Sequence, residues 1–220
     1  MSPYQNSTTA TEHTKRRLEA LCDGVFAVAM TLLVLDLGIP LLSQSSLDTE
    51  ILRHLTELWP KFLAYFLSFL TIALVWVNHE FVFRFLNRMN SKLIWLNISI
   101  LIFSALIPFT TSLVGEYSQS KIAVLLWGIN GLITMGLVIV MWTYARKKGY
   151  FHAGISYQNV KIRKIVDIVT LSLAVIGIST SFFLPIVGML IFGVIIMFHV
   201  IATALGFHEY KSVLSTGGDT

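Results

Sequence analysis

The strongest constraint on the fold is a series of long stretches without a charged residue. Such stretches lie between Lys61 and Glu80 (18 residues), Lys92 and Glu116 (23), Lys121 and Arg146 (24), and Asp167 and Glu209 (41). A helix needs about 20 mainly apolar residues to cross the hydrocarbon core of a membrane. The second and third stretches therefore each predict one span. The last is long enough for two, and Pro185 near its middle predicts a tight turn between them.

The first span is less obvious, because the uncharged residues 24–35 are closely flanked by Glu19, Asp23 and Asp36. With both flanks included, a helix runs to Gly38-Ile39-Pro40, which closes it. Only helices or closed barrels satisfy the backbone in lipid, and these runs are too long and continuous for barrel strands. The fold class is thus an all-α polytopic membrane protein with six transmembrane helices per subunit. The six are expected at roughly 18–39, 60–85, 92–114, 121–145, 163–184 and 186–207.

Composition excludes several other classes. Charged residues make up 13% of the 220, against about 25% in a soluble domain, and the mean hydropathy is +0.74. This excludes disorder, and the single cysteine, Cys22, excludes an intramolecular disulfide. The pI near 9.2 would suit nucleic acid, but the basic residues lie at the ends of apolar runs, which is typical of membrane topology. We expect neither nucleic acid nor a soluble partner.

One membrane domain is expected, at residues 18–208, between a cytoplasmic N-terminal tail at 1–17 and a cytoplasmic C-terminal tail at 209–220. The first residues show no apolar core of a signal peptide. Leu47, Ile51, Leu55 and Leu58 recur at helical spacing between charged residues. This predicts a short amphipathic helix on the outer surface.

Lysine and arginine set the orientation. With six spans both termini share a side, and that side carries thirteen basic residues against three on the other. The termini are therefore expected in the cytoplasm. The opposite side carries Asp36, Asp48, Glu50, Glu57 and Glu116. Such acids would concentrate cations at an outer mouth, or they are simply tolerated outside.

Three polar residues on three predicted helices lie at one depth. Asp23, His79 and Asn97 each stand five or six residues, about 7–9 Å, from a basic residue at the cytoplasmic boundary. Polar groups in a span are costly and are therefore functional suspects. They either brace the helices, because buried polar groups must be hydrogen-bonded whatever the function, or bind a proton or ion directly.

Arg17 and Asp23 lie about 240° apart around one helix, so they need partners on neighbouring helices. The candidates are Trp76, Asn78, His79 and Asn97. No catalytic residues are expected, because no HExxH, GxSxG or P-loop motif is present. No metal site or cofactor is expected either. A carbonyl-lined filter of the TVGYG type is also absent.

The first predicted span, RLEALCDGVFAVAMTLLVLD at 17–36, resembles the signature of the transmembrane protein 175 family of endosomal and lysosomal potassium channels. The family pattern is RxxxFSDG followed by an apolar stretch of the TLLVL type. Arg17, Asp23 and Gly24 match it, whereas Leu21 replaces Phe and Cys22 replaces Ser. The run WVNH at 76–79 also resembles the family. Animal members carry two six-helix units, and this chain carries one, like the prokaryotic branch.

The resemblance implies a homotetramer whose first helix lines a central pore. Carried over by offset from Asp23, the apolar constriction falls on Val28 and a selectivity-biasing threonine on Thr31. Leu32 and Leu35 would form further apolar layers of the ion pathway. The residues implied to brace the helix are Arg17, Asp23, Gly24, Trp76, Asn78 and His79. Independently, positions 24, 28, 31 and 35 are spaced 4, 3 and 4 and so form one stripe of a helix, which could equally be ordinary packing.

The resulting prediction is a passive cation channel of the prokaryotic plasma membrane that passes potassium in preference to sodium. Its partners would be other copies of itself and membrane lipid, and potassium would be the transported ion, with no cofactor. The alternatives are a proton-permeable channel or a proton-coupled transporter using Asp23 and His79. A membrane enzyme and a purely structural membrane protein are the remaining alternatives.

Overall fold

The computed structural model describes the backbone of residues 3–38, 47–151 and 157–216, and the side chains of 13–38, 48–151, 161 and 164–202. Within these ranges the chain forms the helices α1 (Pro3–Leu35), α2 (Leu47–Glu57), α3 (Trp59–Phe85), α4 (Ser91–Glu116), α5 (Lys121–Lys147), α6 (Tyr157–Ser181) and α7 (Pro185–Thr216). All except α2 are long and apolar enough to cross a membrane. The predicted six-span, all-α architecture is confirmed.

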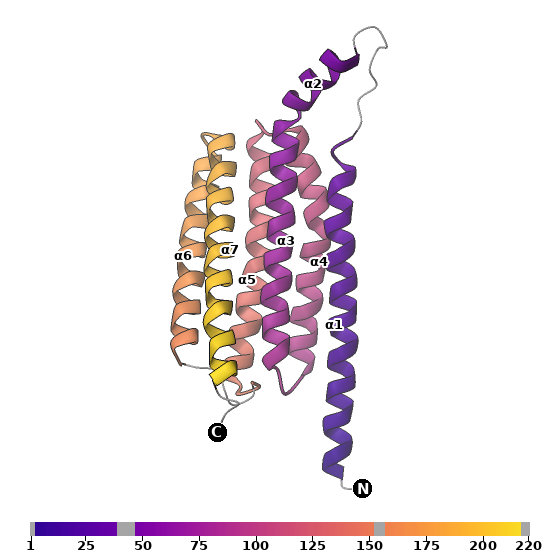
Figure 1. The fold of residues 1–220 in the computed structure, drawn as a ribbon, viewed down its shortest axis with the longest axis vertical. Helices are drawn as coiled ribbons and strands as arrows, with labels where there is room; N and C mark the ends of the chain where they lie inside the picture. Colours follow the sequence, from indigo (N-terminus) through magenta and orange to yellow (C-terminus); the bar gives the residue numbers. More distant parts are fainter. Residues whose placement is uncertain (1–2, 39–46, 152–156, 217–220) are drawn as a thin grey trace.

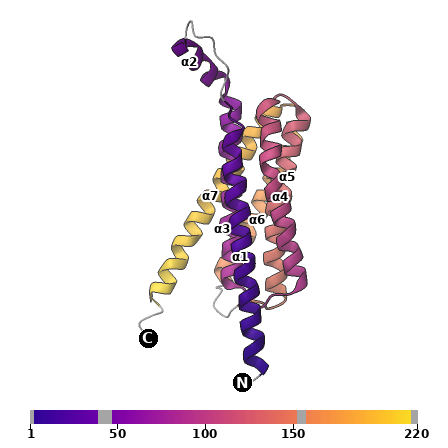
Figure 2. The same ribbon diagram turned by 90° about the vertical axis from the view of Figure 1, so that its right-hand side faces the viewer.

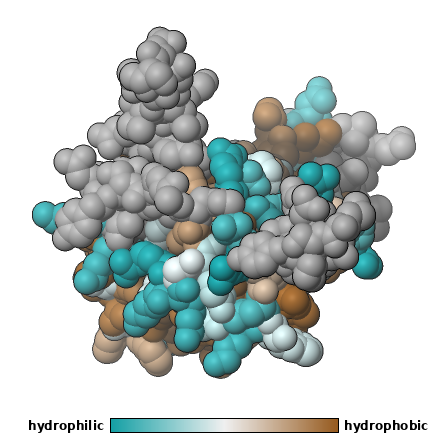
Figure 3. Space-filling view, turned by 90° about the horizontal axis from the view of Figure 1, so that it is seen from below, coloured by the Kyte–Doolittle hydropathy of each residue, from teal (hydrophilic) through white to brown (hydrophobic). Residues whose placement is uncertain are grey.

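The six long helices run side by side along one axis, with α1 at one edge, α6 and α7 at the other, and α3–α5 between them (Figure 1). The first residues of α1 and the last of α7 lie at the same end, as six crossings require. The short helix α2 lies at the opposite end. Figure 2 shows that α7 slants away from the other helices towards its C-terminal end. The end that carries the termini gathers hydrophilic residues (Figure 3).

The boundaries differ from the predicted ones mainly at the chain ends. The helix α1 begins at Pro3, not near residue 18, and α7 continues to Thr216. Proline is well suited to the first turn of a helix, and a helix that has begun adds residues at little cost until a breaker appears. At 33 residues, α1 is about 50 Å long and exceeds the hydrocarbon core. The amphipathic helix α2 and the turn before Pro185 lie where the sequence predicts them.

Two apolar clusters hold the bundle together. The first joins α1, α3, α4 and α5 and contains Phe26, Leu33 and Val75 among its buried residues. The second joins α3–α7 around Trp127 and Phe192. Dispersion between closely packed side chains holds membrane helices together, since lipid tails are as apolar as the side chains they would replace. The helix α1 therefore depends on the first cluster alone, and it contacts α3 and α4.

Candidate ion pathway

The helix α1 has one buried and one exposed face. Phe26 and Leu33 are each 1% exposed and pack against α3 and α4 together with Cys22 and Ala29. On the other side Val28 is 57% exposed and Leu35 is 73% exposed. The buried residues 22, 26, 29 and 33 and the exposed residues 24, 28, 31 and 35 follow the same helical spacing on opposite sides.

The exposed stripe, defined here as Gly24, Val28, Thr31 and Leu35, is the set that the sequence assigns to one face. Leu32 is also exposed. A Cβ placed on Gly24 would meet no atom within 4 Å, so the stripe starts at an open position. In a single chain the whole stripe is exposed. It is therefore free to face lipid or an axis shared with other copies.

Thr31 carries the hydroxyl of the stripe. Its Oγ1 donates a hydrogen bond to the carbonyl oxygen of Val28 at 2.9 Å. A hydroxyl has one proton and two acceptor lone pairs. Because the proton is directed to the helix backbone, the oxygen lone pairs remain on the exposed side. Such an oxygen can accept from a donor or contact a cation, whereas it has no free proton for an anion.

Asp23 is held by α3. The indole Nε1 of Trp76 donates a hydrogen bond to Oδ1 of Asp23 at 2.9 Å. Both side chains are partly open to the surroundings in the single chain. A hydrogen bond to a charged acceptor is stronger than one between neutral groups. This contact joins the middle of α1 to α3 and so restricts rotation of the exposed stripe.

Cys22, His79 and Asn97 form a buried chain of polar contacts across α1, α3 and α4. His79 Nε2 lies 2.7 Å from Asn97 Oδ1, and Asn97 Nδ2 donates to Cys22 Sγ at 3.2 Å. The imidazole also stacks on Phe83, with ring centroids 4.2 Å apart, and meets the edge of Phe26. Each polar group thus has a partner away from water, which the membrane interior demands.

The structure separates two other residues of the predicted brace from this layer. The Asn78 amide donates to the Leu74 carbonyl of its own helix at 2.8 Å, so it does not bind Asp23. Arg17 is exposed, and among the residues whose side chains are described it has no recorded contact with Asp23, His79 or Asn97. Asp23 and His79 have different partners.

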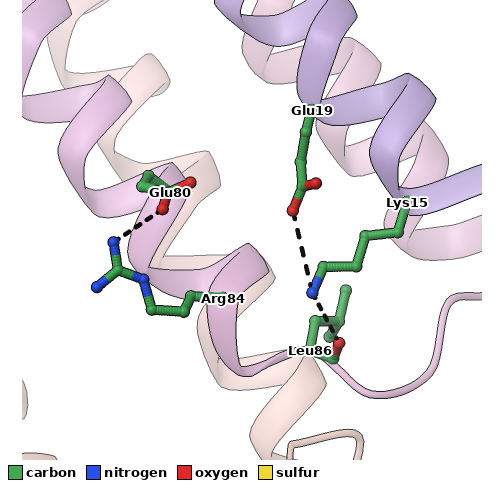
Figure 4. Close-up of polar contacts among 5 residues, drawn as sticks. All are labelled: Lys15, Glu19, Glu80, Arg84 and Leu86. Carbon is green, nitrogen blue, oxygen red and sulfur yellow. Dashed lines mark hydrogen bonds and ion pairs between the residues drawn. The ribbon is translucent and has the colours of Figure 1, made fainter. Parts of the chain in front are cut away.

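Charged residues also fix the N-terminal half of α1 (Figure 4). Lys15 Nζ donates to the Leu86 carbonyl at 3.3 Å and lies 3.9 Å from Glu19. Leu86 caps the C-terminal end of α3, where a positive charge is favourable to the helix dipole. On α3 itself, Arg84 pairs with Glu80 at 2.9 Å. The Lys15 contact could not be predicted from the sequence, because it joins a side chain to a backbone oxygen 71 residues away.

At the opposite end, a second contact fixes α1. Ser112 Oγ on α4 donates to Oδ1 of Asp36, the residue that follows α1, at 2.6 Å. At the same end of the bundle, Lys61 on α3 pairs with Glu116 on α4. Of the acidic residues expected on the outer side, Asp36 and Glu116 therefore have partners within the protein. The span of α1 is tied near both ends, with the exposed stripe between the two attachments.

A second cluster of buried polar residues was not predicted from the sequence. Trp127 Nε1 donates to Ser68 Oγ at 2.8 Å, and the Thr111 hydroxyl lies 2.7 Å from the same Ser68 oxygen. It connects α3, α4 and α5. Small polar residues in spans commonly bond helix carbonyls, so only the presence of an indole donor at matching depth could have indicated this group. Among the described residues, no three His, Cys, Asp or Glu side chains are placed to hold a metal.

The fold is also found among known channels. A structure described as the crystal structure of a lysosomal potassium-selective channel TMEM175 homolog from Chamaesiphon minutus matches with a TM-score of 0.74 and 25% identity. The match covers 87% of this chain and 98% of that one. A potassium channel of Chryseobacterium sp. (strain P1-3) is 30% identical over 179 residues, which is 78% of this chain and 85% of that protein.

The family model described as the endosomal/lysosomal potassium channel TMEM175 matches residues 17–108, which hold the C-terminal part of α1, all of α2 and α3, and most of α4. The endosomal/lysosomal proton channel TMEM175 of Gallus gallus is 34% identical over 112 residues, which is 49% of this chain and 22% of that protein. Six apolar spans and these relatives define a multi-pass membrane protein of an ion-channel class, and not an enzyme, as the sequence predicts. The chain belongs to the TMEM175 family.

Proposed function

We propose that this chain forms a passive, potassium-selective cation channel in which α1 of each subunit lines the pore. The main support is the exposed stripe: α1 is attached at Lys15, Asp23 and Asp36, while the face that carries Val28 and Leu35 is exposed in the described structure. Bacterial relatives named potassium channels support the choice of ion.

A single helix cannot enclose a path, so the channel requires several copies around one axis. Closed rotational symmetry places the same face of every copy towards the axis. We propose a homotetramer, in which four Val28 side chains form the narrowest apolar ring. A narrow apolar ring closes by excluding water. Leu32 and Leu35 add apolar layers on the other side of Thr31.

Thr31 supplies the oxygens that favour a cation. Because each hydroxyl proton is bonded to the Val28 carbonyl, a ring of Thr31 side chains presents oxygen lone pairs. These oxygens replace part of the hydration shell of a passing ion. Potassium gives up its water more readily than sodium, which is smaller, so a ring of weak neutral oxygens favours potassium.

The same proposal places the protein in the plasma membrane of a prokaryote, with both termini in the cytoplasm. The support is the excess of lysine and arginine at the end of the bundle that carries the termini, and the bacterial origin of similar channels. The opposite end, which carries the acidic residues, then faces outwards.

Ion flux from purified protein in liposomes tests the proposal. Wild type should pass potassium faster than sodium, down the gradient only. Thr31→Val keeps the shape but removes the oxygen, and should reduce the preference for potassium. Val28→Ala should raise the flux of both ions. Val194→Ala on α7, a change at another exposed position, should alter neither. Absence of flux, or identical selectivity in all variants, would contradict the proposal.

Proton permeation is a second candidate, because vertebrate relatives are named proton channels. A relay through Asp23 and His79 requires an intermediate group or water, since these residues have separate partners. A pH-sensitive dye inside the same liposomes separates the two functions. Acidification that persists in Thr31→Val but disappears in His79→Gln would establish the relay. A pH gradient that drove potassium uphill would instead indicate a coupled transporter.

A further inference from the structure

A partly open cavity of about 70 Å³ is lined by residues of α3, α5, α6 and α7 and by Ile107 of α4. It is lined mainly by apolar side chains, including Met135, Phe192 and Ile195. Two glycines of α5 explain its shape. A Cβ on Gly128 would lie 2.5 Å from the Phe192 ring, so this glycine admits the ring. A Cβ on Gly131 would meet only Thr71, at 3.9 Å, so this glycine leaves the space open.

The polar groups in the lining have partners within the protein. The Thr71 hydroxyl donates to the Leu67 carbonyl at 2.8 Å, and Thr170 Oγ1 lies 3.1 Å from His199 Nδ1. A buried water needs two to four polar partners, and an apolar cavity without them stays dry. The lining therefore favours an apolar occupant over water or an ion.

The depth of the cavity identifies the source of that occupant. Gly131 is ten residues from the start of α5, or about 15 Å along its axis. Phe192 and His199 are about 10 and 21 Å from the start of α7. The hydrocarbon core is about 30 Å thick, so the cavity lies near its middle. The ends of the lipid acyl chains lie at this depth.

The volume of the cavity limits the size of its occupant. An engineered cavity that accepts benzene measures about 150 Å³. This cavity is about half as large, so a ring of the size of benzene does not fit inside it. The end of one unbranched chain is slender enough. We propose that the cavity between α3, α5, α6 and α7 binds the terminal carbons of a membrane-lipid acyl chain, independently of the proposed ion pathway.

Photolabelling of the whole protein in lipid vesicles tests the proposal. The probe is a phosphatidylcholine with a diazirine at the end of one acyl chain, and the adducts are located by mass spectrometry. In the wild type, adducts should be enriched on Phe192 and Ile195. Val194 and Met197 on the exposed face of the same helix report ordinary lipid contact. This comparison needs no variant.

A matched pair of variants adds a second readout. Gly131→Leu fills the cavity and should reduce labelling of Phe192 and Ile195 several-fold. Gly136→Leu places the same side chain on the same helix, at a position where a Cβ meets no atom within 4 Å and which does not line the cavity. It should leave the labelling unchanged. Adducts confined to Val194 and Met197, or equal labelling in both variants, would overturn the proposal and indicate that the cavity is empty or covered by a neighbouring copy.

Discussion

The indole nitrogen of Trp76 on α3 donates a hydrogen bond to Oδ1 of Asp23 on α1 at 2.9 Å. Asp23 directly precedes Gly24, the first residue of the exposed stripe, and lies five residues, about 7.5 Å, before Val28. A helix with one free face can rotate, and rotation would move the stripe away from a shared axis. The contact therefore links a surface tryptophan to the position of the proposed pore lining.

Trp76→Phe keeps an aromatic ring but removes the donor. We expect a loss of about 1 kcal/mol in the free energy of unfolding, the usual size of a hydrogen bond between membrane helices. Potassium flux should fall further than the loss of folded protein explains, because α1 loses its rotational restraint. Thermal unfolding and flux of the same preparation measure both. Trp95→Phe is the matched control, because Trp95 is exposed on α4 and 66% of its surface is free. Equal effects of the two substitutions would contradict the prediction.

Asp23→Ala removes the acceptor from the same pair and leaves the indole without its partner. We expect this variant to lose assembled, conducting protein, which cross-linking and flux assays measure. A fully active and stable assembly of Asp23→Ala would show that the brace is unnecessary.

Asn97 should contribute more to the free energy of unfolding than its neighbours in the buried polar chain. Asn97→Leu removes the amide that both His79 and Cys22 contact and leaves these two only their mutual contact, His79 Nε2 to Cys22 Sγ at 3.5 Å. Loss of a partner by a buried polar group costs about 1–3 kcal/mol. Cys22→Ser retains a group that can donate and accept, so it should cost far less. Unfolding midpoints in detergent measure the difference.

Asn78→Leu is a control of the same residue type in the same layer. The Asn78 amide bonds only the Leu74 carbonyl of its own helix in the described structure, and that carbonyl belongs to the helical backbone. We expect a small effect. If Asn78→Leu destabilises the protein as much as Asn97→Leu, the interhelical chain is not the source of the stability.

Asp36 should influence flux through its charge. Asp36→Asn keeps an oxygen that can accept from Ser112 but removes the negative charge. The Debye length is about 30 Å at 0.01 M salt and 3 Å at 1 M, so potassium flux should fall at low salt and recover at high salt. Ser112→Ala preserves the charge and should show no such salt dependence. A reduction independent of salt would indicate a structural role alone.

The sequence predicts the six spans, the turn before Pro185 and the amphipathic α2, because charge spacing and proline determine these directly. It also places Asp23, His79 and Asn97 at one depth. Depth leaves the rotation of each helix undetermined, and rotation selects the partners. For this reason the sequence could name Trp76 and Asn78 together, although only Trp76 reaches Asp23 in the structure.

Other contacts could not be predicted from the sequence. The bond from Lys15 to the Leu86 carbonyl depends on where α3 ends, and α1 begins much earlier than hydropathy indicates. The polar residues of α1 before residue 17 do not form an apolar run, yet nothing among them breaks a helix. The packing of α3, α5, α6 and α7 that leaves the cavity beside Gly131 likewise appears only once the helices are assembled.

In the proposed channel, the exposed stripe of α1 lines the path of the ion. Silver ions test it directly, because they resemble potassium in charge and bind thiols. In a Cys22→Ser background, Thr31→Cys should conduct potassium and be blocked by silver. Ala29→Cys on the buried face of α1 and Val194→Cys on α7 should conduct without block. Flux through Thr31→Cys that resists silver, or equal block at Ala29→Cys or Val194→Cys, would contradict the claim.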